Sequence, residues 1–176
     1  MFSISPLPLG EGRGEGLMRI GVVSDTHSKD IPKQLLEDFK SVDLIIHAGD
    51  FCSLSDLRRF QKLKEVRAVF GNMDEQDIRD VLPESLVFEV EGVKVGVYHG
   101  AGPAKAVLDC VKNKFSSEKV DLLIFGHSHQ PLNERNGKAY YFNPGSPNDN
   151  VFAPYCSYGI IEINNGKIEG KIVKVK

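Results

Sequence analysis

The stretch "MRIGVVSD", residues 18–25, is a short apolar run rich in β-branched residues that ends in an aspartate. Such a run is typical of a buried strand, which we place at residues 19–24. The amphipathic segment "PKQLLEDFK" follows at 32–40, and a second apolar run, "VDLIIHA", follows at 42–48. Apolar strands that alternate with amphipathic helices predict an α/β chain in which helices cover both faces of a central sheet system.

The same alternation continues toward the C-terminus and then changes to hairpins. A second helix is predicted at 53–63, where Ser53 or Ser55 can cap its start, and a third strand at 66–71. Residues 86–100 predict two strands joined by a tight turn near Glu91 and Gly92, followed by a helix at about 104–115 and a strand at 120–126. Asn-Gly turn signals within 135–143 and 162–175 predict two further hairpins, and the alternating lysines of the last strand suit an exposed edge. We therefore expect one α/β (α+β) domain over residues 18–176, with mixed sheets and helices outside.

Composition and net charge limit the classes of function that the chain can have. The chain has 176 residues, of which 41% are hydrophobic and 26% charged, with a net charge of −2. This near-neutral balance argues against nucleic acid as a partner, and no apolar run approaches the length that crosses a bilayer. The three cysteines are too widely spaced for a disulfide framework or a zinc ribbon and suit a reducing compartment. We expect a cytoplasmic protein that does not bind membranes.

The first 17 residues differ from the rest of the chain. They are rich in glycine and proline, show no hydrophobic periodicity and do not resemble a signal peptide. We interpret residues 1–17 as a disordered N-terminal extension that takes no part in the fold.

Polar side chains recur where the predicted strands end. Asp25 and His27 follow the first strand, Asp50 the second, Asn72 the third, His99 the hairpin, and His127 and His129 the apolar run "LLIF". Each of them alone has an ordinary explanation as a turn residue or a buried histidine. Ligands of α/β sheets bind outside the carboxyl ends of the strands, however, so the repetition predicts convergence on one site.

The residue types at these positions favour a metal site. Histidine, aspartate and asparagine without thiolates suit Mn²⁺, Fe²⁺, Co²⁺, Ni²⁺ or Zn²⁺ better than Ca²⁺. Seven ligands are too many for one catalytic ion and fit two ions that share a carboxylate. His47, inside the second strand, has no context that requires a metal, and we interpret it as a structural histidine or a partner of a ligand.

The motifs "SDTH", "HAGD", "FGN", "YHG" and "FGHSH" occur in this order from Met18 onward and resemble the five metal motifs of the calcineurin-like metallophosphoesterases. The short length and "FNPGSP" at 142–147 are similar to the small stand-alone bacterial and archaeal phosphodiesterases. The resemblance implies a four-layer α/β/β/α sandwich with the metal site at the carboxyl ends of the strands.

Carried over by motif, the resemblance implies two divalent cations per chain. One would be held by Asp25, His27, Asp50 and His129, and the other by Asp50, Asn72, His99 and His127. Two such ions about 3.5–4 Å apart can hold a bridging hydroxide that attacks phosphorus. The implied function is a metal-dependent phosphodiesterase of a small or exposed phosphate ester. Its catalytic residues would be Asp50, Asn72 and His99, Mn²⁺ would be the favoured ion, and homo-oligomer formation stays open.

One position departs from the resemblance. Many relatives have a histidine after the asparagine of the third motif, where it contacts the phosphate and protonates the leaving group. Here the sequence is "GNMD", and the thioether of Met73 donates no proton. The following residue, Asp74, either orients a nearby histidine or caps the segment that follows.

A different class of function also fits the expected fold. A retromer subunit of similar size shows that this architecture can serve as a protein-interaction scaffold, with vestigial catalysis or none. Such scaffolds degrade the ligand set, whereas this chain keeps all seven residues. We therefore favour the enzyme.

Overall fold

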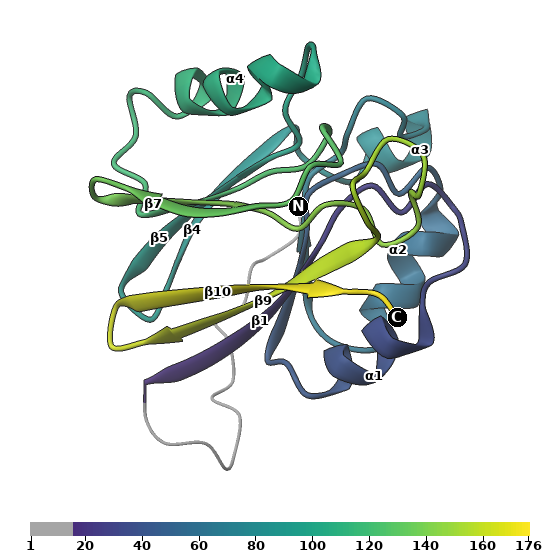
Figure 1. Ribbon diagram of the computed structural model, residues 1–176, viewed down its shortest axis with the longest axis horizontal. Coiled ribbons are helices and arrows are strands. Elements are labelled where there is room, and N and C mark those ends of the chain that lie inside the picture. The colour runs from purple at the N-terminus through teal and green to yellow at the C-terminus, as the bar shows by residue number, and fades with distance from the viewer. Residues whose placement is uncertain (1–15) are drawn as a thin grey trace.

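The computed structural model describes residues 16–176, so residues 1–15 of the expected extension lie outside the described residues (Figure 1). Strand β1 (Leu17–Val23) begins one residue before the expected boundary at Met18. Leu17 pairs with Asn164 of strand β9 (Ser157–Asn164), and the backbone N–H of Asn165 donates to the carbonyl of Gly16 at 3.3 Å.

Two five-stranded sheets form the centre of the molecule. The first contains, in spatial order, β10 (Lys167–Lys174), β9, β1, β2 (Leu44–His47) and β3 (Val66–Ala68). The second contains β4 (Ser85–Val90), β5 (Val93–Tyr98), β6 (Leu122–Ile124), β8 (Ala139–Asn143) and β7 (Leu132–Asn136). Each sheet has three neighbouring parallel strands, β1-β2-β3 and β5-β6-β8, and antiparallel strands beside them. The lysine-bearing β10 is an edge strand, as its sequence predicts.

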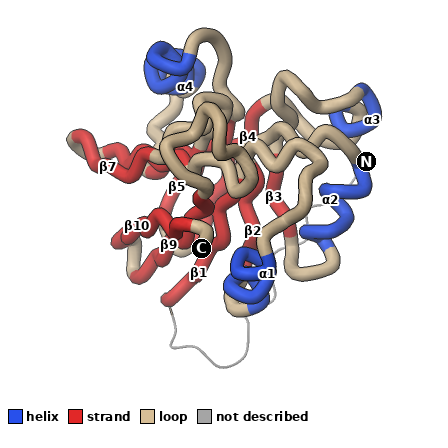
Figure 2. Tube along the Cα trace, turned by 45° about the vertical axis from the view of Figure 1, so that its right-hand side comes forward, coloured by secondary structure: helices blue, strands red, loops and turns tan. Residues whose placement is uncertain are grey.

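Helices lie outside the two sheets (Figures 1 and 2). Helices α1 (Lys33–Lys40) and α2 (Leu54–Gln61) cover the first sheet. The 3₁₀ turn η1 (Ala104–Ala106) and helix α4 (Val107–Lys114) cover the second. The four-layer α/β/β/α arrangement is confirmed, with a short additional helix, α3 (Gln76–Arg79), after β3. Among the described residues, no helix has the length and apolar character that a membrane crossing requires.

The alternation of side chains along the central strands builds two apolar layers at once. Leu44 and Ile46 of β2 face the core between the sheets, whereas Ile45 between them faces the helices. Both faces of β2 are therefore buried, which explains why its sequence is a continuous apolar run. On the helix side, Leu35 and Phe39 of α1 are fully buried, as their helical spacing predicts.

The two sheets approach closely at an aromatic ring. Phe142 of β8 is fully buried in the core between the sheets. Its ring lies against two glycines of the first sheet, Gly159 and Gly170. The approach is so close that an added Cβ atom would stand 2.3 Å from the ring at Gly159 and 2.8 Å from it at Gly170. The two glycines thus leave the space that the ring fills.

We expect the substitution Gly159→Ala to lower the free energy of unfolding by about 1–3 kcal/mol, because the added methyl group overlaps the ring of Phe142. Urea denaturation of both proteins measures the loss. In a Phe142→Leu background the same substitution should cost less, since the ring edge is gone. An equal cost in both backgrounds would contradict this packing.

Candidate metal centre

The loops that follow β1 and β2 stay hydrogen-bonded to each other beyond the strands. The backbone N–H of Asp25 donates to the carbonyl of Gly49 at 2.9 Å, and that of His27 donates to the carbonyl of Asp50 at 3.0 Å. A further bond joins the two sheets, since the backbone N–H of His127 donates to Asp25 Oδ2 at 3.1 Å. The site is therefore built from both sheets.

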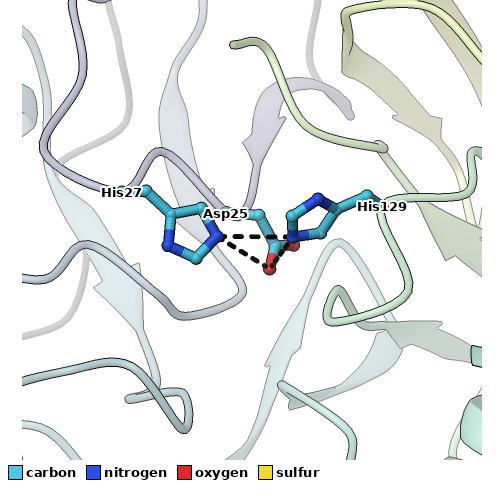
Figure 3. A group of neighbouring side chains, drawn as sticks. All are labelled: Asp25, His27 and His129. Carbon is cyan, nitrogen blue, oxygen red and sulfur yellow. Dashed lines mark hydrogen bonds and ion pairs between the residues drawn. The ribbon is translucent and has the colours of Figure 1, made fainter. Parts of the chain in front are cut away.

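One group of side chains contains Asp25, His27 and His129, whose ring nitrogens and carboxylate point toward one another (Figure 3). His129 Nε2 lies 3.1 Å from Asp25 Oδ1 and 3.3 Å from His27 Nε2. His27 Nε2 lies 3.9 Å from Asp25 Oδ1 and also 3.9 Å from Asp50 Oδ2. Asp50 thus borders this group.

The second group contains Asp50 and His99, with Asn72 and His127 beside them, and Asp25 Oδ1 borders it 3.9 Å from His99 Nε2. His99 Nε2 lies 3.3 Å from Asp50 Oδ2, and Asn72 Oδ1 lies 3.1 Å from His99 Nε2 and 2.8 Å from His127 Nδ1. Asp50 Oδ2 therefore faces both groups, while its Oδ1 accepts the backbone N–H of Met73 at 2.7 Å. The structure brings together all seven residues that the motifs single out.

The contacts of the outward ring nitrogens determine which nitrogen of each ring carries the hydrogen and which carries the lone pair. For three histidines the outward nitrogen contacts an atom that only accepts hydrogen bonds: the Ala48 carbonyl for His99, the Gly102 carbonyl for His127 and the Asp149 carboxylate for His129. That nitrogen must carry the hydrogen, so in the neutral ring the inward nitrogen carries the lone pair. His27 places its Nδ1 3.6 Å from Cys52 Sγ.

Acceptor atoms consequently face acceptor atoms at the centre of the site. Asn72 Oδ1 lies between two imidazole lone pairs, and the buried Asp25 Oδ1 faces the lone pair of the neutral His129 Nε2 at 3.1 Å. A buried unpaired acceptor costs about 1–3 kcal/mol, and more when it is charged. Divalent cations accept all these lone pairs at once, so the residues fit a metal centre.

Without a metal, protons take over the positive charge. Burial alone would lower the pKa of His99, but the hydrogen bond and charge of Asp50 and the charge of Asp25 raise it to about 9. Burial would also lower the pKa of His129, but the hydrogen bonds and charges of Asp25 and Asp149 raise it to about 9. For Asp25 burial opposes ionisation, yet the His129 hydrogen bond and the charges of both histidines lower the pKa to about 2.

The backbone of the site is strained. Five of the seven residues adopt a left-handed conformation, with φ between 50° and 65°: Asp25, His27, Asp50, His127 and His129. Such conformations are uncommon outside glycine and cost about 1–3 kcal/mol each. They persist at sites where the surrounding structure imposes them, as the hydrogen bonds between the loops do here.

Asp74 supports one of these turns. Its buried carboxylate accepts backbone N–H groups of Asp50 at 3.0 Å, Cys52 at 2.7 Å and Gly71 at 2.7 Å. It therefore neither orients a histidine nor caps the following helix, where Glu75 holds the N-cap position. Gly71 is required beside it, since a Cβ atom there would stand 2.1 Å from Asp50 Oδ1.

His47 has the structural role that the sequence allows. Its ring is fully buried and stacks on Phe51 with centroids 3.5 Å apart. Its Nδ1 accepts the backbone N–H of Gly49, and its Nε2 contacts Thr26 Oγ1, both at 3.2 Å. Burial keeps its pKa well below the usual value, so the ring is neutral.

Sequence reasoning missed Asp149. The residue lies in the loop after β8, 20 positions from the histidine that it contacts, and no motif marks it. Its carboxylate accepts the Nδ1 hydrogen of His129, which fixes the orientation of that ring. Burial opposes ionisation of Asp149, but hydrogen bonds from His129 and two backbone N–H groups lower its pKa to about 2.

These pKa values predict how the metal-free protein responds to pH. Histidines with a folded pKa of about 9 and an ordinary value of 6.5 stabilise the fold fully below pH 6.5, and this contribution disappears as the pH rises through 9. The free energy of unfolding of metal-stripped protein should therefore fall between pH 6.5 and 9 in urea denaturation. Protein loaded with Mn²⁺ should show a smaller change, because its histidines are neutral ligands. An equal fall in both forms would contradict the prediction.

Comparison with known proteins shows the family of the chain. The family model of the calcineurin-like phosphoesterase superfamily domain matches residues 18–166. A probable metallophosphoesterase of Methanocaldococcus jannaschii is 35% identical over 169 residues, covering 92% of this chain and 83% of the relative. A phosphodiesterase of the same organism is 29% identical over 144 residues, covering 73% of this chain and 83% of the relative.

Solved structures share the fold. Vps29 from Entamoeba histolytica, complexed with Zn²⁺, superposes with a TM-score of 0.70 at 25% identity, over 90% of this chain and 100% of that one. Because the family model matches residues 18–166, which contain all five motifs, the chain belongs to the calcineurin-like phosphoesterase superfamily.

Proposed function

We propose that this chain is a metal-dependent phosphodiesterase that uses two divalent cations, with Mn²⁺ as the favoured ion. The observation that carries the proposal is the convergence of lone pairs, in which histidine nitrogens, the Asn72 amide oxygen and two carboxylates face one another. When bound, two such ions supply a nucleophilic hydroxide at neutral pH and neutralise charge on the phosphoryl group. The phosphodiesterase among the relatives supports the reaction class.

The protein's own residues hold the ions and orient the ligands. Asp50, whose Oδ2 faces both groups, is the shared ligand and holds the two halves of the site together. Asn72 and His99 complete the second half, where the Ala48 carbonyl keeps His99 Nε2 directed inward. We assign catalytic roles to Asp50, Asn72 and His99 on this basis.

A pocket of about 350 Å³ opens over Asp50, Asn72 and three histidines of the candidate ligand set. Its size suits a small or exposed phosphate ester. Lys29 is the one lysine or arginine among its described lining residues, so it supplies a positive charge that attracts the anionic ester.

The pocket lacks a histidine that is free to act as an acid. Its three lining histidines, His27, His127 and His129, all belong to the candidate ligand set. Met73 occupies the rim and is 58% exposed, and Asp74 is engaged with backbone N–H groups. Without a histidine acid, we expect leaving groups that depart with little protonation to be favoured, that is, aryl over alkyl esters.

The shared-ligand role is tested by Asp50→Asn. Elemental analysis should find two ions per chain in the reconstituted parent protein and a loss of metal from both halves in the variant, because the amide removes the negative charge between them. Asp109→Asn, the same change on the exposed face of α4, should leave the metal content unchanged. At most one ion per chain in the parent would contradict the two-metal assignment.

The leaving-group assignment is tested by Met73→His. A general acid contributes about 10²–10⁴-fold when the leaving group is poor. The variant should therefore raise kcat/KM for alkyl phosphodiesters more than for aryl phosphodiesters at equal metal content. An unchanged ratio would place Met73 away from the leaving group.

A protein-interaction scaffold remains the second candidate. The exposed apolar side chains of Val151 and Phe152 and the similarity to a Vps29 structure favour it. Metal-reconstituted protein without hydrolysis of any phosphomono- or diester, in a screen over several divalent ions, would decide for the scaffold.

A further inference from the structure

Three apolar side chains border the candidate metal centre, and we refer to Met73, Val151 and Phe152 as the apolar rim. They are 58%, 76% and 77% exposed, respectively. Six large hydrophobic side chains are exposed among the described residues, and three of them line this one pocket together with the candidate ligands. Scattered exposed hydrophobic residues need no explanation, but this gathering at the pocket does.

One side of the rim is tied to His129. The Oδ1 atom of Asp149 accepts the backbone N–H groups of Val151 at 2.8 Å and of Phe152 at 3.1 Å, while Oδ2 contacts the His129 ring. Gln130 Nε2 donates to the carbonyl of Phe152 at 2.9 Å. These bonds use only the backbone of the rim residues, so their apolar side chains are free to contact a ligand.

The other side of the rim is tied to the shared carboxylate. The backbone N–H of Met73 donates to Asp50 Oδ1 at 2.7 Å, which leaves its side chain on the pocket wall. Both sides of the rim are thus placed relative to the candidate metal ligands by hydrogen bonds. A phosphate held at the centre would have its ester group within reach of the same pocket wall.

We propose that the apolar rim binds a planar aromatic group that stays on phosphorus when the leaving group departs, so that the preferred substrates are phosphodiesters whose retained substituent is aromatic. This inference rests on the proposed function and specifies its substrate class. A phenyl ring and a thioether make favourable contacts with aromatic rings. The pocket of about 350 Å³ suits a small molecule.

The test compares two substrates with the same leaving group, phenyl p-nitrophenyl phosphate and methyl p-nitrophenyl phosphate. In Phe152→Ala, kcat/KM for the phenyl ester should fall roughly tenfold and that for the methyl ester less than about twofold, because only the former loses a ring contact. Phe152→Tyr should retain the preference for the phenyl ester. Val81→Ala, which removes an exposed apolar side chain outside this pocket, should change neither value.

A binding measurement separates this proposal from the proposed function. Calorimetric titration of Mn²⁺-loaded protein should show phenylphosphonate binding roughly tenfold more tightly than methylphosphonate, with the difference lost in Phe152→Ala. Equal binding of the two phosphonates would overturn the aromatic subsite even if esters are hydrolysed. Preferential binding of phenylphosphonate without hydrolysis of any ester would uphold the subsite and overturn the phosphodiesterase.

Discussion

Acceptor atoms that face one another are the constraint on which the rest of the site depends. In the neutral rings of His99, His127 and His129 the inward nitrogens carry lone pairs, because the outward nitrogens donate to the protein. Together with Asn72 Oδ1 and the carboxylates they repel one another unless positive charge lies between them. Protons supply that charge in part, as the raised pKa values of two histidines show, and divalent cations satisfy every acceptor at once.

The fold holds these groups together at a cost in backbone strain. Two sheets meet with the carboxyl ends of their parallel strands on one side, and the loops there take left-handed turns that direct side chains inward. Asp74 stabilises the turn at Asp50 by accepting three backbone N–H groups. A packed sandwich with two buried apolar layers can impose such turns, whereas an isolated loop would relax.

Patterns local in sequence were sufficient to predict most of this arrangement. Apolar runs predicted the central strands, Asn-Gly pairs predicted two hairpins, and the polar residues that follow the strands predicted the candidate site. Contacts between residues that lie far apart in the sequence could not be predicted. Asp149 reaches His129 only because the loop after β8 folds back, and Asp74 reaches Asp50 across 24 positions. The inclusion of Leu17 in β1 likewise depends on its partner Asn164, far along the chain.

The two oxygens of Asp149 have different partners, so this carboxylate couples the orientation of one side chain to the order of a loop. One oxygen fixes the ring of His129, and the other orders the backbone that carries Val151 and Phe152. A conformational preference transmitted through a shared group acts equally in both directions. Whatever holds the imidazole in its liganding orientation also lowers the entropy of the loop, and whatever orders the loop improves the imidazole as a ligand. Under the proposed function, metal affinity and ester selectivity would therefore be coupled, and natural variation in this loop would change both together.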